Sequence, residues 1–208
     1  MKANAHLKTR VKGAGQTNPL VFRYGLWIDG KMHWAESSME KSQLLEDLSI
    51  RVRLLNLHSR VEYLKFYVTN QSRLSKEAKL IILQCHANPA VEQFCFVSPA
   101  EEVIFHLAGN SIYLVNGMNS EGKMKQCTVQ PLWNLGTDRL WRCEESGRLN
   151  YQPLAKGASV SLFSLDLSIS PFETQECSCW AIEGSDINIL IDLNKLLLKN
   201  RLAFSEKK

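Results

Sequence analysis

The chain has 208 residues, of which 45% are hydrophobic and 22% charged, and its net charge is +4. This composition is typical of one globular domain with a sizeable core, and it excludes a disordered or fibrous chain. So small a net charge gives no reason to expect a nucleic-acid or membrane partner. No segment approaches the roughly 20 apolar residues of a membrane helix, and residues 1–18 lack the apolar stretch of an export signal, so we expect a cytoplasmic protein.

Residues 1–18 combine scattered lysines and arginines with Gly13, Gly15 and Asn18. Such a composition buries little surface and allows many backbone states, which predicts a flexible basic arm. The alternative is a basic tail that contacts phosphate, but its cations are too widely spaced to favour that interpretation.

Residues 19–60 begin with two β-prone runs, LVFRYGLWI and KMHWA, separated by Asp29 and Gly30. This dipeptide fits a type I′ turn, so the sequence predicts an N-terminal β-hairpin.

A short helix is predicted next, over residues 38–48. Ser37 and Glu40 match a capping box, and Leu44, Leu45 and Leu48 follow at helical spacing. The continuation SIRVRLLNLH fits both a strand and a helix, and its alternating apolar residues favour a strand.

Residues 61–184 have a consistent β pattern. In VEYLKFYVTN the residues Leu64, Phe66 and Val68 share one face of the expected strand. The run KLIILQC is apolar on both faces, which indicates a central strand. Further short β-prone runs recur at intervals of roughly 8–12 residues with turn signals between them. We therefore predict a mainly β protein whose body is an antiparallel β-sandwich.

The last segment, residues 185–208, is predicted to be a helix. Ser185 can cap its first turn, Asp186 suits the positive end of the helix dipole, and Lys195 and Lys199 suit the negative end. Its apolar residues extend around more than one narrow stripe, so we expect it to bury most of its surface against the body or a partner.

Two stretches, YLKFYVTNQS and LDLSISPFETQECSCW, resemble strands of bacterial immunoglobulin-like and fibronectin type III-like β-sandwich modules. The resemblance covers residues 61–183 and names no specific family. It implies adhesion, scaffolding or partner recognition more often than catalysis.

The six cysteines are expected to stay reduced, because no export signal precedes them. They are Cys85, Cys95, Cys127, Cys143, Cys177 and Cys179. On a strand, Cys177 and Cys179 would share a face by pleating alone, and no second closely spaced pair accompanies them. We expect neither a metal nor a cofactor.

Catalytic patterns are weak. Cys95 with His106 is the pair to test for a cysteine nucleophile, but a lone histidine in a β run is usually structural. The adjacent acids Glu101 and Glu102, and likewise Glu144 and Glu145, are expected to be solvated turn charges, and neither a P-loop nor a G-x-G-x-x-G element occurs.

The candidate binding residues are Tyr63, Lys65 and Tyr67, on the strand face opposite Leu64. If that face is exposed, it offers an aromatic patch for a sugar or a single-stranded nucleic acid.

We therefore expect a non-catalytic binding or scaffold protein that acts through a β-sandwich surface, with a protein partner or a second copy bound through the C-terminal helix. The alternatives are small-molecule or glycan binding through the aromatic patch or in a tryptophan-lined cleft, and a cysteine-dependent enzyme.

Overall fold

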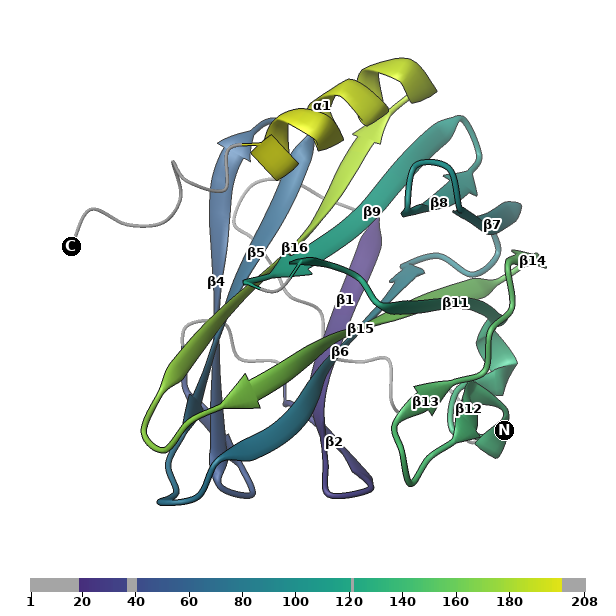
Figure 1. Cartoon of the computed structure of the whole chain (residues 1–208). Coiled ribbons are helices and arrows are strands. Elements are labelled where there is room, and N and C mark those ends of the chain that lie inside the picture. The colour runs from purple at the N-terminus through teal and green to yellow at the C-terminus, as the bar shows by residue number, and fades with distance from the viewer. Residues whose placement is uncertain (1–18, 37–40, 121, 200–208) are drawn as a thin grey trace.

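A computed structural model of the chain describes residues 19–36, 41–120 and 122–199. Two large antiparallel sheets pack face to face, and one α-helix follows them (Figure 1). The predicted mainly β sandwich with a C-terminal helix is confirmed. The predicted arm at 1–18, the capping-box residues and the end of the chain from 200 lie outside the described residues.

The first sheet, called sheet A, has five strands in the order β11, β15, β6, β1, β2. Their bounds are β1 (Leu20–Ile28), β2 (Lys31–Trp34), β6 (Lys76–His86), β11 (Gln126–Pro131) and β15 (Ser159–Ile169). The run KLIILQC lies in β6, the middle strand, as its two apolar faces predicted.

The second sheet, called sheet B, has nine strands in the order β14, β7, β8, β9, β16, β5, β4, β3, with β10 paired to β9. Their bounds are β3 (Gln43–Leu45), β4 (Leu48–His58), β5 (Val61–Asn70), β7 (Gln93–Ser98), β8 (Val103–Ala108), β9 (Ser111–Asn119), β10 (Gly122–Lys123), β14 (Leu154–Lys156) and β16 (Thr174–Gly184). Between β11 and β14 lie the 3-10 helices η1 (Leu132–Asn134) and η2 (Asp138–Leu140) and the small pair β12 (Trp141–Cys143) and β13 (Arg148–Leu149).

The predicted N-terminal hairpin is confirmed. Ile28 pairs with Lys31, so Asp29 and Gly30 alone form the turn. Both have positive φ angles, 48° and 84°, which is the backbone that a type I′ turn requires.

The helix predicted over 38–48 is wrong within its described part. β3 occupies Gln43–Leu45, and β4 begins at Leu48 after a turn. Leu48, Ile50 and Val52 alternate into the core between the sheets, so the pairing of β4 with β5 outweighs the helical spacing of the leucines. The strand interpretation of the following residues is confirmed.

Apolar side chains form three clusters. The largest lies between the two sheets and includes Leu64, Phe66 and Val68, as their shared face predicted. A second lies between the outer face of sheet A and the segment 132–149, and a third between the outer face of sheet B and the helix. Both outer faces are therefore covered in part.

The helix α1 (Ile187–Lys199) lies across one end of sheet B, over β5, β16 and β9 (Figure 1). Leu190 and Asn194 are buried, whereas Ile189 and Leu196 are 46% and 54% exposed. Against the sheet α1 buries one side only, so the expected burial of most of its surface would need a partner and stays a prediction. Within the described residues, no helix could span a lipid bilayer.

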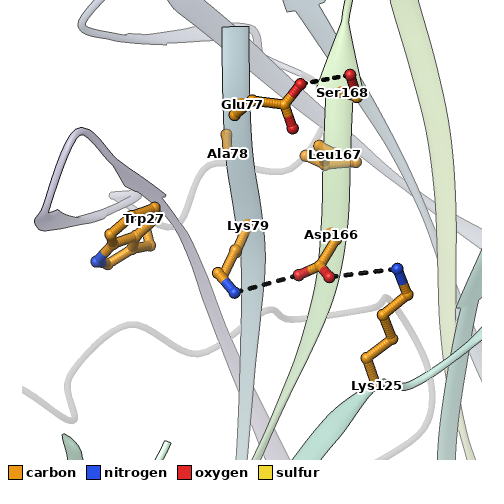
Figure 2. Close-up of a pocket in the computed structure, with 8 residues that line it drawn as sticks. All are labelled: Trp27, Glu77, Ala78, Lys79, Lys125, Asp166, Leu167 and Ser168. Carbon is orange, nitrogen blue, oxygen red and sulfur yellow. Dashed lines mark hydrogen bonds and ion pairs between the residues drawn. The ribbon is translucent and has the colours of Figure 1, made fainter. Parts of the chain in front are cut away.

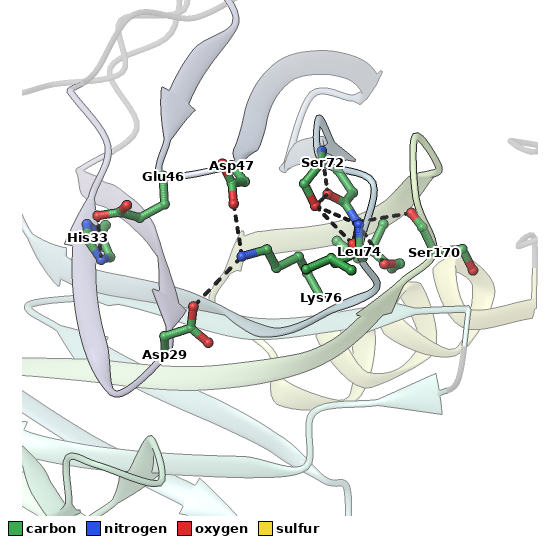
Figure 3. A network of polar contacts seen from close by, with 10 residues as sticks. Asp29, His33, Glu46, Asp47, Ser72, Leu74, Lys76 and Ser170 are labelled. Atoms are coloured by element: carbon green, nitrogen blue, oxygen red, sulfur yellow. Dashed lines mark hydrogen bonds and ion pairs between the residues drawn. The ribbon is translucent and has the colours of Figure 1, made fainter.

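At the opposite end, ion pairs and hydrogen bonds join the turns of the two sheets (Figure 3). The Lys76 Nζ lies 3.0 Å from an Asp47 carboxylate oxygen and 3.9 Å from one of Asp29. The buried Asn70 at the end of β5 donates to the carbonyl of Ile169 in β15. These contacts hold the strand ends of sheet A against those of sheet B.

Candidate functional site

The sequence-predicted residue Tyr63 lies beneath α1. Its ring stacks on Trp180, with centroids 5.7 Å apart and an interplanar angle of 1°, and its side chain is 5% exposed. Burial raises the pKa of the Tyr63 hydroxyl. The expectation that Tyr63 is exposed is wrong, because α1 covers this part of the outer face of sheet B.

The other two predicted residues lie beyond the helix. Lys65 is 6% exposed, and its Nζ lies 2.9 Å from a carboxylate oxygen of Glu176. Tyr67 is half-buried, and the cationic groups of Arg51, Arg53 and Lys65 lie 4.9, 5.7 and 5.4 Å from its ring centroid. The structure therefore presents a tyrosine ringed by cations in place of the expected exposed patch of two tyrosines and a lysine.

Cys95 and His106 do lie opposite each other, on β7 and β8, but inside the core. His106 Nε2 lies 2.7 Å from Ser161 Oγ, which donates its hydrogen to Gln84 Oε1 at 2.8 Å. With the Gln84 amide oriented in this way, Nε2 carries the proton of the neutral ring.

Burial opposes any catalytic role for this pair. Desolvation, aided by the charge of His86, lowers the pKa of His106 to about 3, and burial raises the pKa of the Cys95 thiol. So weak a base cannot deprotonate so weak an acid at neutral pH, and the geometry gives a structural histidine.

The remaining cysteines and acids have structural positions. Cys177 and Cys179 share the inner face of β16 and pack in the core between the sheets. None of the six cysteines forms a disulfide, and no group of three potential metal-ligating side chains occurs in the described parts of the chain. Glu144 and Glu145 are exposed in the turn between β12 and β13.

A pocket lies on the outer face of sheet A, beside the segment 132–149, with a volume of about 270 Å³ (Figure 2). The register of three neighbouring strands brings its lining residues together. Trp27 of β1 pairs with Lys79 of β6, which pairs in turn with Asp166 of β15. Since directly paired residues point to the same face of a sheet, these three side chains form one row across three strands.

A second row lies beside the first. Glu77 of β6 pairs with Ser168 of β15, two residues along each strand from Lys79 and Asp166. Ser168 Oγ donates to Glu77 Oε1 at 2.5 Å.

Lysines balance the charge of the pocket. Lys79 Nζ lies 3.4 Å from Asp166 Oδ1, and Lys125 Nζ lies 3.4 Å from Oδ2, so the carboxylate sits between two amino groups (Figure 2). With Glu77 the pocket holds two cations and two anions. Among the described residues Asp166 Oδ1 accepts no hydrogen bond, although the Lys79 amino group lies 3.4 Å from it.

Trp27 is fixed in place by the turn between β12 and β13. Its Nε1 donates to the Glu144 carbonyl at 2.7 Å. The turn approaches the indole at Gly147, where a Cβ would lie only 2.7 Å from Trp27 Cδ2 and where φ is +59°. Only glycine satisfies both the close approach and this backbone angle, so Gly147 sets the wall against which the indole rests.

Sequence reasoning did not identify this pocket. Lys79 and Asp166 are each the one charged residue of their β run, AKLIILQC and VSLFSLDLSI. A charged residue in a central strand is unusual and was the available signal. Their pairing depends on the register of β6 with β15, and the sequence pattern does not predict this register.

Comparisons with known proteins give little further information. No family model matches the chain, and no curated protein matches it. Among solved structures, it is similar to a bacterial glucoamylase complexed with acarbose, with 14% identity and a TM-score of 0.46 over 86% of this chain. The match covers 30% of that protein's chain, and at this TM-score it supports no conclusion about fold or function.

Proposed function

We propose that this chain is a non-catalytic binding protein, and that the pocket at Trp27 holds a small, neutral, polyhydroxylated ligand such as a sugar. The observation that carries the proposal is the row of Trp27, Lys79 and Asp166 on adjacent strands. It places an aromatic ring beside donors and acceptors in one pocket. Pockets for small ligands typically combine an apolar wall with a few convergent polar groups.

The chemistry of the lining suits hydroxyl groups. The carboxylates of Glu77 and Asp166 accept hydrogen bonds, the lysines donate them, and the Ser168 hydroxyl does both. An indole offers a flat apolar surface to the C–H face of a sugar ring. Because the charges within the pocket balance, a neutral ligand gains these contacts without leaving an ion unpaired.

Binding without reaction is the role that these contacts favour. Asp166 is paired with two lysines and Glu77 is hydrogen-bonded to Ser168, so neither carboxylate stands free to act as acid, base or nucleophile. The pocket volume of about 270 Å³ suits a single small ligand.

The test is calorimetric titration of the full chain with a panel of neutral mono- and disaccharides, after a glycan array has selected members of the panel. We expect at least one sugar to bind with a dissociation constant of about 1 mM or lower, and Trp27→Ala to weaken it about tenfold or more. Asp166→Asn, which keeps the size of the side chain, should weaken binding of the same sugar.

Trp133→Ala is the matched control, because Trp133 is 62% exposed and does not line the pocket. The proposal fails if no neutral sugar binds, or if Trp133→Ala weakens binding while Trp27→Ala leaves it unchanged. Binding of nucleotides in preference to sugars would also contradict it.

A second candidate is a cytoplasmic scaffold whose helix binds a partner or a second copy. Ile189 and Leu196 support it, because they are two turns apart on one side of α1 and both are exposed. Sedimentation equilibrium tests self-association: a dimer that Ile189→Lys/Leu196→Lys converts to a monomer supports this candidate, and a monomer at all concentrations contradicts the second-copy version.

A further inference from the structure

Along one edge of sheet B, part of β4 has no neighbouring strand among the described residues. β3 has only three residues, and its pairs with β4 end at Ile50. From Arg51 to Leu55, β4 pairs with β5 on one side and with no described strand on the other. The regular pairing with β5 is interrupted after Leu55. An edge strand of this kind presents backbone N–H and C=O groups that another extended chain can pair with.

The side chains along this edge have a definite pattern. Arg51 and Arg53 lie on the outer face beside Tyr67, whereas Val52 and Leu54 face the core between the sheets. Leu54 is half-buried, so part of it remains open at the edge.

The two arginines have no carboxylate partner among the described residues. No ion pair joins either guanidinium to a described acid, and the nearby Glu176 is paired with Lys65 at 2.9 Å. Instead the guanidinium groups lie against the Tyr67 ring, 4.9 and 5.7 Å from its centroid. Stacking on an aromatic ring orients an arginine while leaving its N–H donors available to a ligand.

We propose that the β4 edge binds an extended acidic segment of a partner protein as an added strand. Residues of the added strand that lie opposite Arg51 and Arg53 would be acidic, since paired residues share a face and opposite charges across strands attract. Residues opposite Val52 and Leu54 would be apolar, and would cover the open part of Leu54. The expected partner segment therefore alternates acidic and apolar residues.

Two other partners fit the β4 edge less well than an acidic segment does. A second copy that paired through its own β4 edge would bring arginines against arginines, which is destabilising. A nucleic acid would gain contacts to phosphates from the arginines, but it has no N–H and C=O ladder to pair with the strand edge.

Fluorescence anisotropy of the full chain with a labelled short peptide, in which glutamate alternates with valine, tests the proposal. We expect binding with a dissociation constant below about 1 mM, and Arg51→Glu/Arg53→Glu should weaken it about tenfold or more. The control Arg142→Glu/Arg148→Glu makes the same change in net charge at two exposed arginines on the separate strand pair β12–β13, and should leave affinity nearly unchanged.

A peptide that is N-methylated on the amides facing the edge separates strand addition from charge attraction alone. It should lose binding, whereas methylation on the opposite edge of the peptide should not. Equal binding of both methylated peptides, equal weakening by the control variant, no peptide binding up to about 1 mM, or tighter binding of single-stranded DNA than of the peptide would each overturn the proposal. The pocket at Trp27 lies on sheet A, so none of these results depends on the proposed sugar site.

Discussion

His106 shows how burial turns a potential catalytic group into part of the scaffold. The sequence places a histidine in a β run, where its role is ambiguous, and the structure encloses it between the sheets with Ser161 and Gln84. Its hydrogen bond to Ser161 holds β8 of sheet B to β15 of sheet A. The consequence is measurable, because the folded and unfolded states bind protons differently.

We expect His106 to reduce stability as the pH falls. Its pKa is about 3 in the folded chain, against 6.5 for a histidine in water, so the unfolded chain binds the proton first between these values. Stability therefore decreases as the pH is lowered through this window. Between about pH 7 and about pH 5.5, urea unfolding should show the native chain losing about 1 kcal/mol more than His106→Gln. Equal losses in the two proteins would contradict the burial of a neutral histidine.

Tyr63, Lys65 and Tyr67 show what a strand pattern does and does not predict. Alternation correctly separates them from Leu64, Phe66 and Val68, because side chains of a strand alternate between two faces. It cannot tell whether a second element covers the polar-looking face. The aromatic and alkyl parts of Tyr63 and Lys65 allow both residues to be buried once a helix or an ion partner is present.

At the scale of elements, α1 is attached to sheet B by a buried polar side chain as well as by apolar contacts. Asn194 Oδ1 accepts hydrogen bonds from Trp180 Nε1 at 3.0 Å and from Asn116 Nδ2 at 3.1 Å. One amide oxygen thus satisfies a donor on β16 and a donor on β9. A shift of the helix by one residue would leave both donors unpaired in the core.

Asn194→Ala should destabilise the protein by about 2–4 kcal/mol, because it removes the acceptor of two buried donors. Urea unfolding monitored by tryptophan fluorescence measures the change. Asn188→Ala, on the exposed part of the same helix, is the control and should change the free energy of unfolding by less than about 0.5 kcal/mol. If both variants have the same stability, Asn194 does not fix the helix.

Local signals predicted the elements that depend on local chemistry. Asp29 and Gly30 identify the first hairpin because their positive φ angles are a property of the turn itself. The helix predicted from Leu44, Leu45 and Leu48 was wrong, because their spacing is also compatible with two strands once β4 can pair with β5. The pocket was not predictable from pattern alone, because Lys79 and Asp166 meet only through the register of β6 with β15.

At the scale of the whole molecule, the outer face of each sheet is covered only in part, which leaves two different surfaces exposed. The segment 132–149 covers part of the outer face of sheet A and stops at the Trp27 pocket. The helix α1 lies over one end of sheet B (Figure 1) and leaves the arginines around Tyr67 uncovered. The first surface is a charge-balanced pocket and the second is a cationic strand edge. The proposed sugar and the proposed acidic segment would therefore bind to different sheets.

The most direct test of the binding proposal is ¹⁹F NMR of the chain labelled with 5-fluorotryptophan. The chain has 5 tryptophans, and the resonance absent from Trp27→Phe belongs to Trp27. On addition of the sugar selected by titration, we predict that this resonance shifts progressively while that of the exposed Trp133 does not. Saturable binding of the sugar that moves the Trp133 resonance, or that leaves the Trp27 resonance in place, would contradict the proposed site.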